Sequence, residues 1–335
     1  MKRILGLAIA VAALGSAGEA LAWGSTGHRM IGRAAIESLP ADLPPFLRSA
    51  AAAAAAGELS REPDRSRNAG KAHDADRDPG HFVDADDAGR VGGVLMLGAL
   101  PPTREDYETQ LRAAGFTAWK MGYLPYSIVE DWQQLAKDFA YWRVDDAGAR
   151  HTADPAHRAW MEADRARREA LILSDIGALS HFVGDGCMPL HVSVHYNGWG
   201  DLPNPNGYTQ EKVHVAWEGV YVRQVVDYAA MRARMAPFQD CGCPIEQRVG
   251  AYLAADLTTV IPFYELEKAG AFKSQDPRGV EFTTGRVAAG AAELRDEIVL
   301  AWRASAQGRP GWPEVSVADV EAGRVDPYDS LFGLD

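Results

Sequence analysis

The sequence predicts an all-α protein built as a single, mainly helical domain. Apolar residues recur at helical spacing in several long segments, and no long segment alternates as a strand does. No linker, charge block or repeat divides the chain after its N-terminal leader. The expected helices cover 27–39, 126–142, 155–185, 212–230, 244–269 and 285–304.

The first 22 residues are predicted to be a secretory signal peptide. Two basic residues precede an apolar stretch over 4–14 that is too short to span a bilayer, and 20–22 form an A-x-A cleavage site. Cleavage after Ala22 leaves a catalytic-domain candidate, 23–335, that begins with Trp23. We therefore expect an exported protein, periplasmic or extracellular, without a membrane anchor.

Local sequence signals mark the end of the first helix and the positions of two loops. Prolines at 40, 44 and 45 separate the first helix from a second one that includes an alanine run over 50–56. The stretches 89–102 and 196–208 are rich in glycine, proline and asparagine, so they are expected to be loops.

Charge and cysteine content limit the function classes. The formal net charge is −12, and it becomes −13 once the leader, with two basic residues and one acidic residue, is removed. Such an acidic surface argues against broad phosphate-tracking contacts with nucleic acid.

Cys187, Cys241 and Cys243 allow at most one internal disulfide, and the sequence does not choose the pair. Cys187 is interpreted as a packing residue or half of that disulfide.

Three histidines and two carboxylates gather near the middle of the chain. His181 and Asp185 are spaced i, i+4, as are His214 and Glu218, so each pair shares one face of a helix. A glycine and a proline after Asp185 predict that the helix ends there, so His191 returns from the next turn. A single such pair is more often a surface contact. Two pairs around a third histidine favour a zinc site.

Further candidate ligands lie upstream. The Trp23 α-amine and carbonyl, once cleavage exposes them, can chelate a metal in a five-membered ring, and His28 can complete that site. Asp64 and His81 supply one more carboxylate and one more imidazole. His195 has no matching carboxylate in the sequence and is interpreted as a non-ligand.

In these ordered motifs the chain resembles the secreted zinc-dependent nucleases specific for single strands (S-one/P-one type), which are related to bacterial zinc-dependent phospholipase C. The resemblance covers most of the mature chain and implies an all-helical fold with a trinuclear zinc cluster at the base of a cleft. Its nine ligand positions are filled in order by Trp23, His28, Asp64, His81, His181, Asp185, His191, His214 and Glu218.

The resemblance also implies how three Zn²⁺ ions are shared. The first ion takes Asp64, His81, His181 and Asp185; the second takes His191, His214 and Glu218; the third takes the Trp23 amine and carbonyl, His28 and the bridging Asp185. Asp185 and Asp64 are then the catalytic carboxylates, and Asp64 orients the attacking water. Two zinc ions about 3.5–4 Å apart can supply hydroxide near neutral pH.

The implied function is that of a secreted phosphodiesterase, an endonuclease that hydrolyses single-stranded DNA and RNA. Its partner is a nucleic acid or nucleotide, and no protein partner is implied. Phe82 follows the ligand His81 directly and is expected to stack on an unpaired base, while Asp84 accepts hydrogen bonds from that base. The alternative for these two residues is core packing and a turn cap.

Two departures from the nuclease pattern keep other functions open. Glu218 stands where the nucleases usually have aspartate, as in the phospholipase, and the loop before it lacks their Gly-Gly-Asn segment. A zinc-dependent phospholipase C is therefore the second hypothesis, with Trp199 and Tyr208 either on an exposed apolar rim or packed inward. The third is a non-catalytic, zinc-stabilised exported binding protein.

Overall fold

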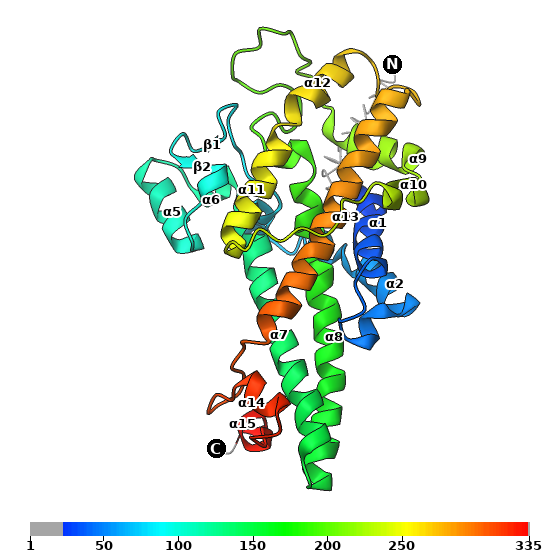
Figure 1. Ribbon diagram of the computed structural model, residues 1–335. Helices are drawn as coiled ribbons and strands as arrows, with labels where there is room; N and C mark the ends of the chain where they lie inside the picture. Colours follow the sequence, from blue (N-terminus) through cyan, green and yellow to red (C-terminus); the bar gives the residue numbers. More distant parts are fainter. Residues whose placement is uncertain (1–22, 334–335) are drawn as a thin grey trace, which may run out of the picture.

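The computed structural model describes residues 23–333, and these form the predicted all-α fold (Figure 1). The expected signal peptide, 1–22, lies outside the described residues. The helices are α1 (Gly24–Glu37), α2 (Ala50–Leu59), α3 (Glu62–Arg65), α4 (Lys71–Arg77), α5 (Arg104–Ala113), α6 (Ala118–Met121), α7 (Leu124–His151), α8 (Pro155–Gly186), α9 (Val222–Val225), α10 (Tyr228–Ala233), α11 (Ile245–Leu257), α12 (Val260–Lys268), α13 (Pro277–Ser305), α14 (Val317–Glu321) and α15 (Tyr328–Phe332). Short 3-10 turns are η1 (Pro45–Arg48), η2 (Asp78–His81), η3 (Leu97–Ala99) and η4 (Pro189–His191); η5 (Ala216–Tyr221) is a π-helical turn, and strands β1 (Arg90–Val91) and β2 (Leu95–Met96) form one small antiparallel hairpin.

Three long helices form the scaffold. The helices α7 and α8 make an extended antiparallel hairpin, α13 packs along both of them, and α1 and α2 lie against the upper half of α8 (Figure 1). Ile172, Ile176 and Leu179 recur at helical spacing on α8 and are fully buried. The α8 backbone also comes very close to the end of α2, because a Cβ at Gly177 would lie 2.5 Å from that of Leu59.

Two predicted helices are divided in the structure. The segment 212–230 becomes η5, α9 and α10, because Asp227 is extended and its side chain accepts a hydrogen bond from the Ala230 amide, which starts a new helix. The segment 244–269 divides between α11 and α12, where Thr259 Oγ1 donates to the Asp256 carbonyl.

Of the helices in the described residues that were not expected from the sequence, α5 is the longest. Its first turn is capped by Thr103, whose hydroxyl accepts from the Asp106 amide. The stretch before it, 89–102, which was expected to be a loop, contains the β1–β2 hairpin and the 3-10 turn η3 as well as turns and irregular chain.

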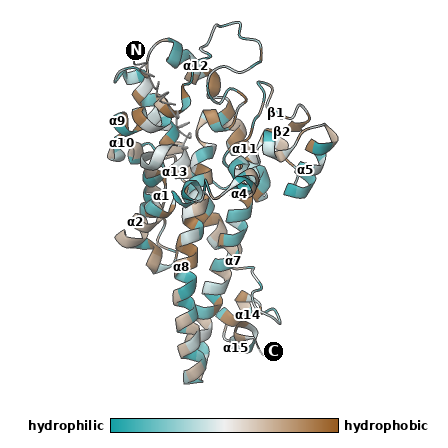
Figure 2. Cartoon of the chain, turned by 180° about the vertical axis from the view of Figure 1, so that it is seen from behind, coloured by the Kyte–Doolittle hydropathy of each residue, from teal (hydrophilic) through white to brown (hydrophobic). Residues whose placement is uncertain are grey.

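The surface of the long hairpin is polar. Hydrophilic colour dominates its lower end and much of α5, whereas the hydrophobic colour gathers where helices meet (Figure 2). Among the helices of the described part of the chain, none has the length and apolarity that crossing a membrane requires.

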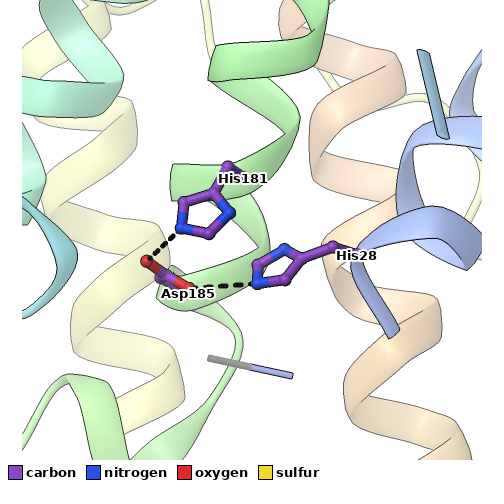
Figure 3. Close-up of side chains that lie close together, drawn as sticks. All are labelled: His28, His181 and Asp185. Atoms are coloured by element: carbon purple, nitrogen blue, oxygen red, sulfur yellow. Dashed lines mark ion pairs between the residues drawn. The ribbon is translucent and has the colours of Figure 1, made fainter. Parts of the chain in front are cut away.

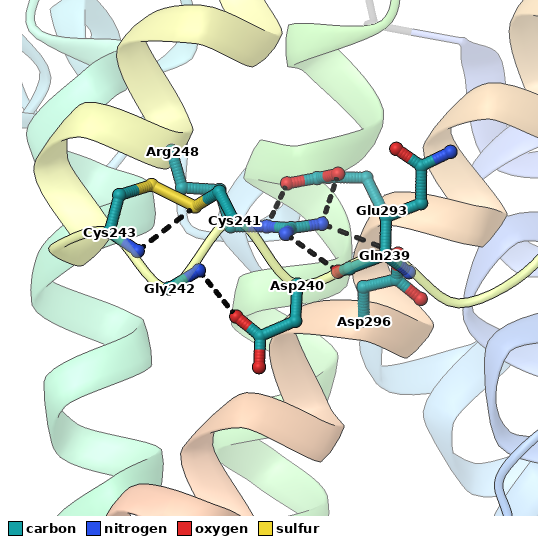
Figure 4. The surroundings of a disulfide bond; sticks show 8 residues. All are labelled: Gln239, Asp240, Cys241, Gly242, Cys243, Arg248, Glu293 and Asp296. Atoms are coloured by element: carbon teal, nitrogen blue, oxygen red, sulfur yellow. Dashed lines mark hydrogen bonds and ion pairs between the residues drawn. A yellow bond between two sulfur atoms is a disulfide. The ribbon is translucent and has the colours of Figure 1, made fainter.

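The disulfide joins Cys241 to Cys243, and Cys187 is a free, buried thiol. The bridge lies in the segment that leads into α11 (Figure 4). Arg248 fixes this segment, because it donates to the Gln239 carbonyl over 2.9 Å while forming an ion pair with Glu293 over 2.7 Å. The packing interpretation of Cys187 is therefore the one that the structure supports.

Candidate metal centre

The side-chain ligands predicted from the sequence come together around the C-terminal end of α8. They form three groups, in each of which one potential ligand atom per residue lies within 4.8 Å of the others. We name them the N-terminal group (His28, His181 and Asp185), the central group (Asp64, His81 and His181) and the C-terminal group (His191, His214 and Glu218). These side chains come from segments as far apart in the chain as α1 and η5.

The central group has the spacing of a coordination shell. His81 Nδ1 lies 2.9 Å from His181 Nε2, and Asp64 Oδ1 lies 3.9 Å from the same atom. Asp185 adds a fourth donor, since its Oδ2 lies 3.2 Å from His81 Nδ1. Donors around a tetrahedral zinc, with bonds of 2.0–2.1 Å, are about 3.3 Å apart.

Asp185 links the central and N-terminal groups. Its Oδ1 faces His28 Nε2 over 3.5 Å, while its Oδ2 faces His181 Nε2 over 3.4 Å. Figure 3 shows this arrangement, with His181 and Asp185 on one face of α8 and His28 reaching in from α1. The predicted bridging position of Asp185 therefore has the required geometry, one oxygen for each of two metal positions.

Trp23 is anchored beside the N-terminal group. Its indole Nε1 donates to the Gly184 carbonyl over 2.6 Å, and the ring is fully buried against Trp217. Gly184 must lack a side chain here, since a Cβ would lie 2.8 Å from His28 Nδ1. The Trp23 carbonyl also accepts from the Gly27 amide over 3.1 Å, which fixes the start of α1 next to the ligands.

In the C-terminal group, the three donor atoms converge closely. The Nε2 atoms of His191 and His214 lie 3.1 Å apart, and Glu218 Oε2 is 3.0 Å from the second of these. The π-helical turn η5 contains Glu218, whereas His214 lies just before it. Neither carboxylate oxygen of Glu218 has a hydrogen-bond partner within the described residues.

Main-chain carbonyls fix the tautomers of three of these histidines. His181 Nδ1 lies 2.9 Å from the Ser60 carbonyl, His191 Nδ1 lies 2.6 Å from the His81 carbonyl, and His214 Nδ1 lies 2.7 Å from the Tyr196 carbonyl. A carbonyl can only accept, so each Nδ1 carries the proton and each neutral ring turns a lone pair inward from Nε2. Such outer partners are the usual support of metal-binding histidines.

The convergence of lone pairs indicates a cation. Two imidazole lone pairs and a carboxylate oxygen repel one another at about 3 Å unless a proton or metal ion lies between them. Burial also raises the pKa of Asp185 well above its usual range and lowers the pKa of His181 well below its usual range. The residues therefore fit bound divalent cations with nitrogen and oxygen ligands, which is the donor set of catalytic zinc sites.

The predicted base-binding residues lie on an extended segment beside these groups. Along 81–85, inward and outward positions alternate, so that Val83 is buried while Phe82 and Asp84 share the outward face and are each partly exposed. Burial raises the pKa of Asp84 to about 7, and the positive charge of Lys120 opposes that shift. The His81 carbonyl, which directly precedes Phe82, accepts from His191 Nδ1, so this contact fixes the start of the segment next to the candidate ligands.

Arg67 is a site residue that the sequence reasoning missed. Its Nη1 lies 3.7 Å from Asp64 Oδ1, and its Nε lies 3.3 Å from Asp78 Oδ1. Its charge lowers the pKa of Asp64 against the effect of burial, which raises it to about 7. The three-residue spacing between Asp64 and Arg67 is the sequence signal that could have found it.

The other singled-out residues lie outside the metal groups. His195 Nε2 lies 2.9 Å from Asp87 Oδ1, and its ring stacks on Trp199. The sequence offered no carboxylate for His195, whereas the structure pairs it with Asp87; this pair is separate from the three groups named above. Trp199 and Tyr208 are only 4% and 5% exposed, so of the two placements considered for them the structure has the inward one.

Comparisons with protein-family models, with curated proteins and with solved structures found no match to this chain. The geometry of the side chains is therefore the evidence on which a function can be argued. The resemblance seen in the ordered motifs stays a prediction.

Proposed function

We propose that this protein is a secreted zinc-dependent phosphodiesterase of the single-strand-specific nuclease type, which hydrolyses single-stranded DNA and RNA. The observation that carries the proposal is the C-terminal group, where the Nε2 lone pairs of His191 and His214 meet Glu218 with no proton available from their fixed tautomers. The shared carboxylate of Asp185 adds the link that a multinuclear centre requires.

The metal positions define the reaction class. Bound zinc would act as a Lewis acid toward a phosphate oxygen and would lower the pKa of a water molecule to near neutrality. The N-terminal group would be completed by the amine and carbonyl of Trp23 once the leader has been removed. Its packing beside Gly184 supports this role, since it brings the start of the mature chain to the ligands.

Residues around the metal positions would orient the substrate. Asp64, one side of which faces Arg67, can accept a hydrogen bond from the attacking water and align it with the phosphorus. The Arg67 guanidinium offers positive charge at the edge of the central group, where a phosphodiester would carry negative charge. Phe82 and Asp84 present a ring and an acceptor side by side for an unpaired base.

A base inside a duplex is already stacked and paired, so it could neither stack on Phe82 nor donate to Asp84 without leaving the helix. This argument favours single strands. The phospholipase hypothesis relied on Trp199 and Tyr208 as a rim that seeks a lipid interface, and both side chains are buried. No specific observation therefore favours it as a second candidate.

The test is an activity panel with zinc-loaded mature protein. It contains single-stranded DNA, RNA, a duplex of the same sequence, 3′-nucleotides and phosphatidylcholine. We expect cleavage of both single strands and much slower cleavage of the duplex. His191→Ala should abolish cleavage and remove part of the zinc measured by elemental analysis. Phosphatidylcholine hydrolysis without oligonucleotide cleavage would establish a phospholipase, and zinc binding without any hydrolysis would establish a binding protein.

A further inference from the structure

Three chain segments lie side by side next to the metal groups. The middle one is 82–86; it bridges to Gly122 in antiparallel fashion through Val83 and to Ser193 in parallel fashion through Ala85. The main chain at Gly122 approaches this segment closely, because a Cβ there would overlap the Phe82 carbonyl. The φ of Gly122 is +73°, a second reason for glycine at this position. The middle segment is therefore flanked along one edge by the residue that ends α6 and along the other by the segment at Ser193.

The helix α6 is held rigidly against the middle segment. The Asp84 amide donates to the Met121 carbonyl over 2.8 Å, and the buried Tyr107 hydroxyl donates to the Gly122 carbonyl over 2.7 Å. Two residues of α6 nevertheless point into solvent. Trp119 is 65% exposed, and Lys120 is exposed but close enough to Asp84 to act on its pKa.

An exposed indole at this position is unusual in a packed protein. Large aromatic side chains are mostly buried, and the neighbouring Met121 and Tyr123 follow that rule. Trp119 instead stands open on a short helix that the main chain fastens to the candidate base-binding segment. An aromatic ring next to a cationic side chain is the combination that holds a base and its phosphate in single-strand binding proteins.

We infer that Trp119 and Lys120 form a second nucleotide position, next to the one lined by Phe82 and Asp84, so that a single strand is held by at least two consecutive nucleotides. This inference rests on the proposed function. In it, the indole stacks on the second base and the ammonium group pairs with the phosphate between the two bases. The order along the protein is then metal groups, Phe82, Asp84 and α6.

Two other carboxylates near this face, those of Asp86 and Asp87, are engaged elsewhere. Asp86 Oδ1 accepts hydrogen bonds from the amides of Ala88 and Arg90, each over 2.9 Å, so its charge is directed into a turn. Asp87 faces His195. Lys120 is thus an exposed cation on this flank that can meet a phosphate, with Asp84 as the carboxylate beside it.

The first experiment compares Trp119→Ala with wild type on substrates of increasing length. For a single-stranded oligonucleotide, kcat/KM should fall about 5- to 150-fold, the range of base stacking on an aromatic ring. A small chromogenic phosphodiester and a 3′-mononucleotide, which cannot reach the second position, should be cleaved at the wild-type rate. Trp119→Phe should restore most of the loss, since a phenyl ring also stacks.

The second experiment measures how salt affects binding of a phosphorothioate single strand that resists cleavage. For single strands, log K falls with log salt by about 0.7 per phosphate contact. Lys120→Gln should therefore make the slope shallower by about 0.7. The matched control is Lys137→Gln on α7, an exposed lysine that donates to Gln134 and should leave the slope unchanged.

The outcomes separate this inference from the proposed function. If wild type cleaves single strands but Trp119→Ala cleaves them equally well, the second position is overturned and the nuclease proposal stands. Equal losses on the oligonucleotide and the small ester would also overturn it, because they indicate damaged packing. If wild type cleaves no nucleic acid at all, the proposed function fails and this inference fails with it.

Discussion

At the scale of single residues, the centre depends on hydrogen bonds that the ligands make away from the metal positions. The carbonyls of Ser60, His81 and Tyr196 each hold one histidine Nδ1, which leaves Nε2 free to bind a cation. His81 has two roles in this arrangement. Its side chain is a candidate ligand, and its main-chain carbonyl orients His191. A change at one ligand is therefore expected to disturb its neighbour.

The role of Phe82 can be tested at this scale. Phe82→Ala should lower the rate on oligonucleotides by roughly one to two orders of magnitude, because it removes base stacking. The rate on a small chromogenic phosphodiester should hardly change, since that substrate has no base to stack. Steady-state kinetics on both substrates make the comparison. Equal losses on both would indicate that the ring only packs against Gly122.

The role of Trp23 depends on removal of the leader. In the precursor its nitrogen is an amide, which is a very poor metal ligand, whereas the free α-amine of the mature chain can bind zinc. We expect exported protein to begin Trp-Gly-Ser by N-terminal sequencing. Protein with a methionine or a tag before Trp23 should lose one zinc ion or most of its turnover. Three zinc ions and full activity in such a protein would disprove the assignment.

At the scale of secondary structure elements, close helix packing positions the ligands. The end of α2 touches α8 at Gly177, and the next residue along α2, Ser60, supports His181 through its carbonyl. A shift of α2 away from α8 would therefore move a ligand. The far end of the hairpin formed by α7 and α8 differs from the end that carries candidate ligands. Carboxyl groups are buried there with no candidate metal ligands nearby.

Replacement of Gly177 tests the packing. The Cβ of alanine would lie 2.5 Å from the Leu59 Cβ, so Gly177→Ala should lower the free energy of unfolding by about 1–3 kcal/mol and weaken zinc binding at the central group. The control is Gly285→Ala on α13, where a new Cβ meets no atom within 4 Å. That variant should gain about 0.5–1 kcal/mol from helix propensity. Denaturant unfolding of both proteins measures the difference, and a stabilised Gly177→Ala would contradict the packing argument.

The buried carboxyl group of Asp145 on α7 makes stability depend on pH. Burial raises its pKa to about 8, above the value of 3.8 in the unfolded chain. Between these values the folded protein keeps a proton that the unfolded chain releases, so this contribution to stability is present at low pH and is lost as pH rises through about 8. Asp145→Asn, which cannot ionise, should therefore become more stable relative to wild type as pH rises.

Thermal or denaturant unfolding of Asp145→Asn and wild type between pH 5 and 8.5 checks this prediction. The difference in unfolding free energy should change by at most about 1.4 kcal/mol per pH unit. Asp329→Asn on α15, an exposed aspartate, serves as the charge-matched control and should show no trend. A difference for Asp145→Asn that does not vary with pH would contradict the prediction.

At the scale of the whole molecule, metal binding should be coupled to folding. The candidate ligands come from α1, α3, η2, α8, η4 and the start of the η5 region, so their donor atoms meet only in the folded chain. Binding to the folded state alone stabilises it. We expect close to three zinc ions per mature chain by elemental analysis and a lower melting temperature in chelator, restored by added zinc. A stoichiometry of one or none would rule out the trinuclear centre.

The sequence by itself determined the helical class of the fold and the set of side chains that the structure brings together as candidate metal ligands. Both follow from local spacing: apolar periodicity predicts helices, and i, i+4 pairs such as His181 and Asp185 share one helix face wherever the helix lies. The same local signals did not predict the break at Asp227 or the helix that Thr103 caps, because single polar side chains compete there with the periodic pattern.

Only the tertiary structure decided how the ligands are supported and what surrounds them. The carbonyl that fixes each histidine tautomer comes from a distant segment, as when Ser60 supports His181, and no sequence spacing encodes that contact. The same holds for the disulfide between Cys241 and Cys243, for the burial of Trp199 and for the open position of Trp119. These features arise from packing between segments far apart in the chain, so their physical cause exists only once the helices have assembled.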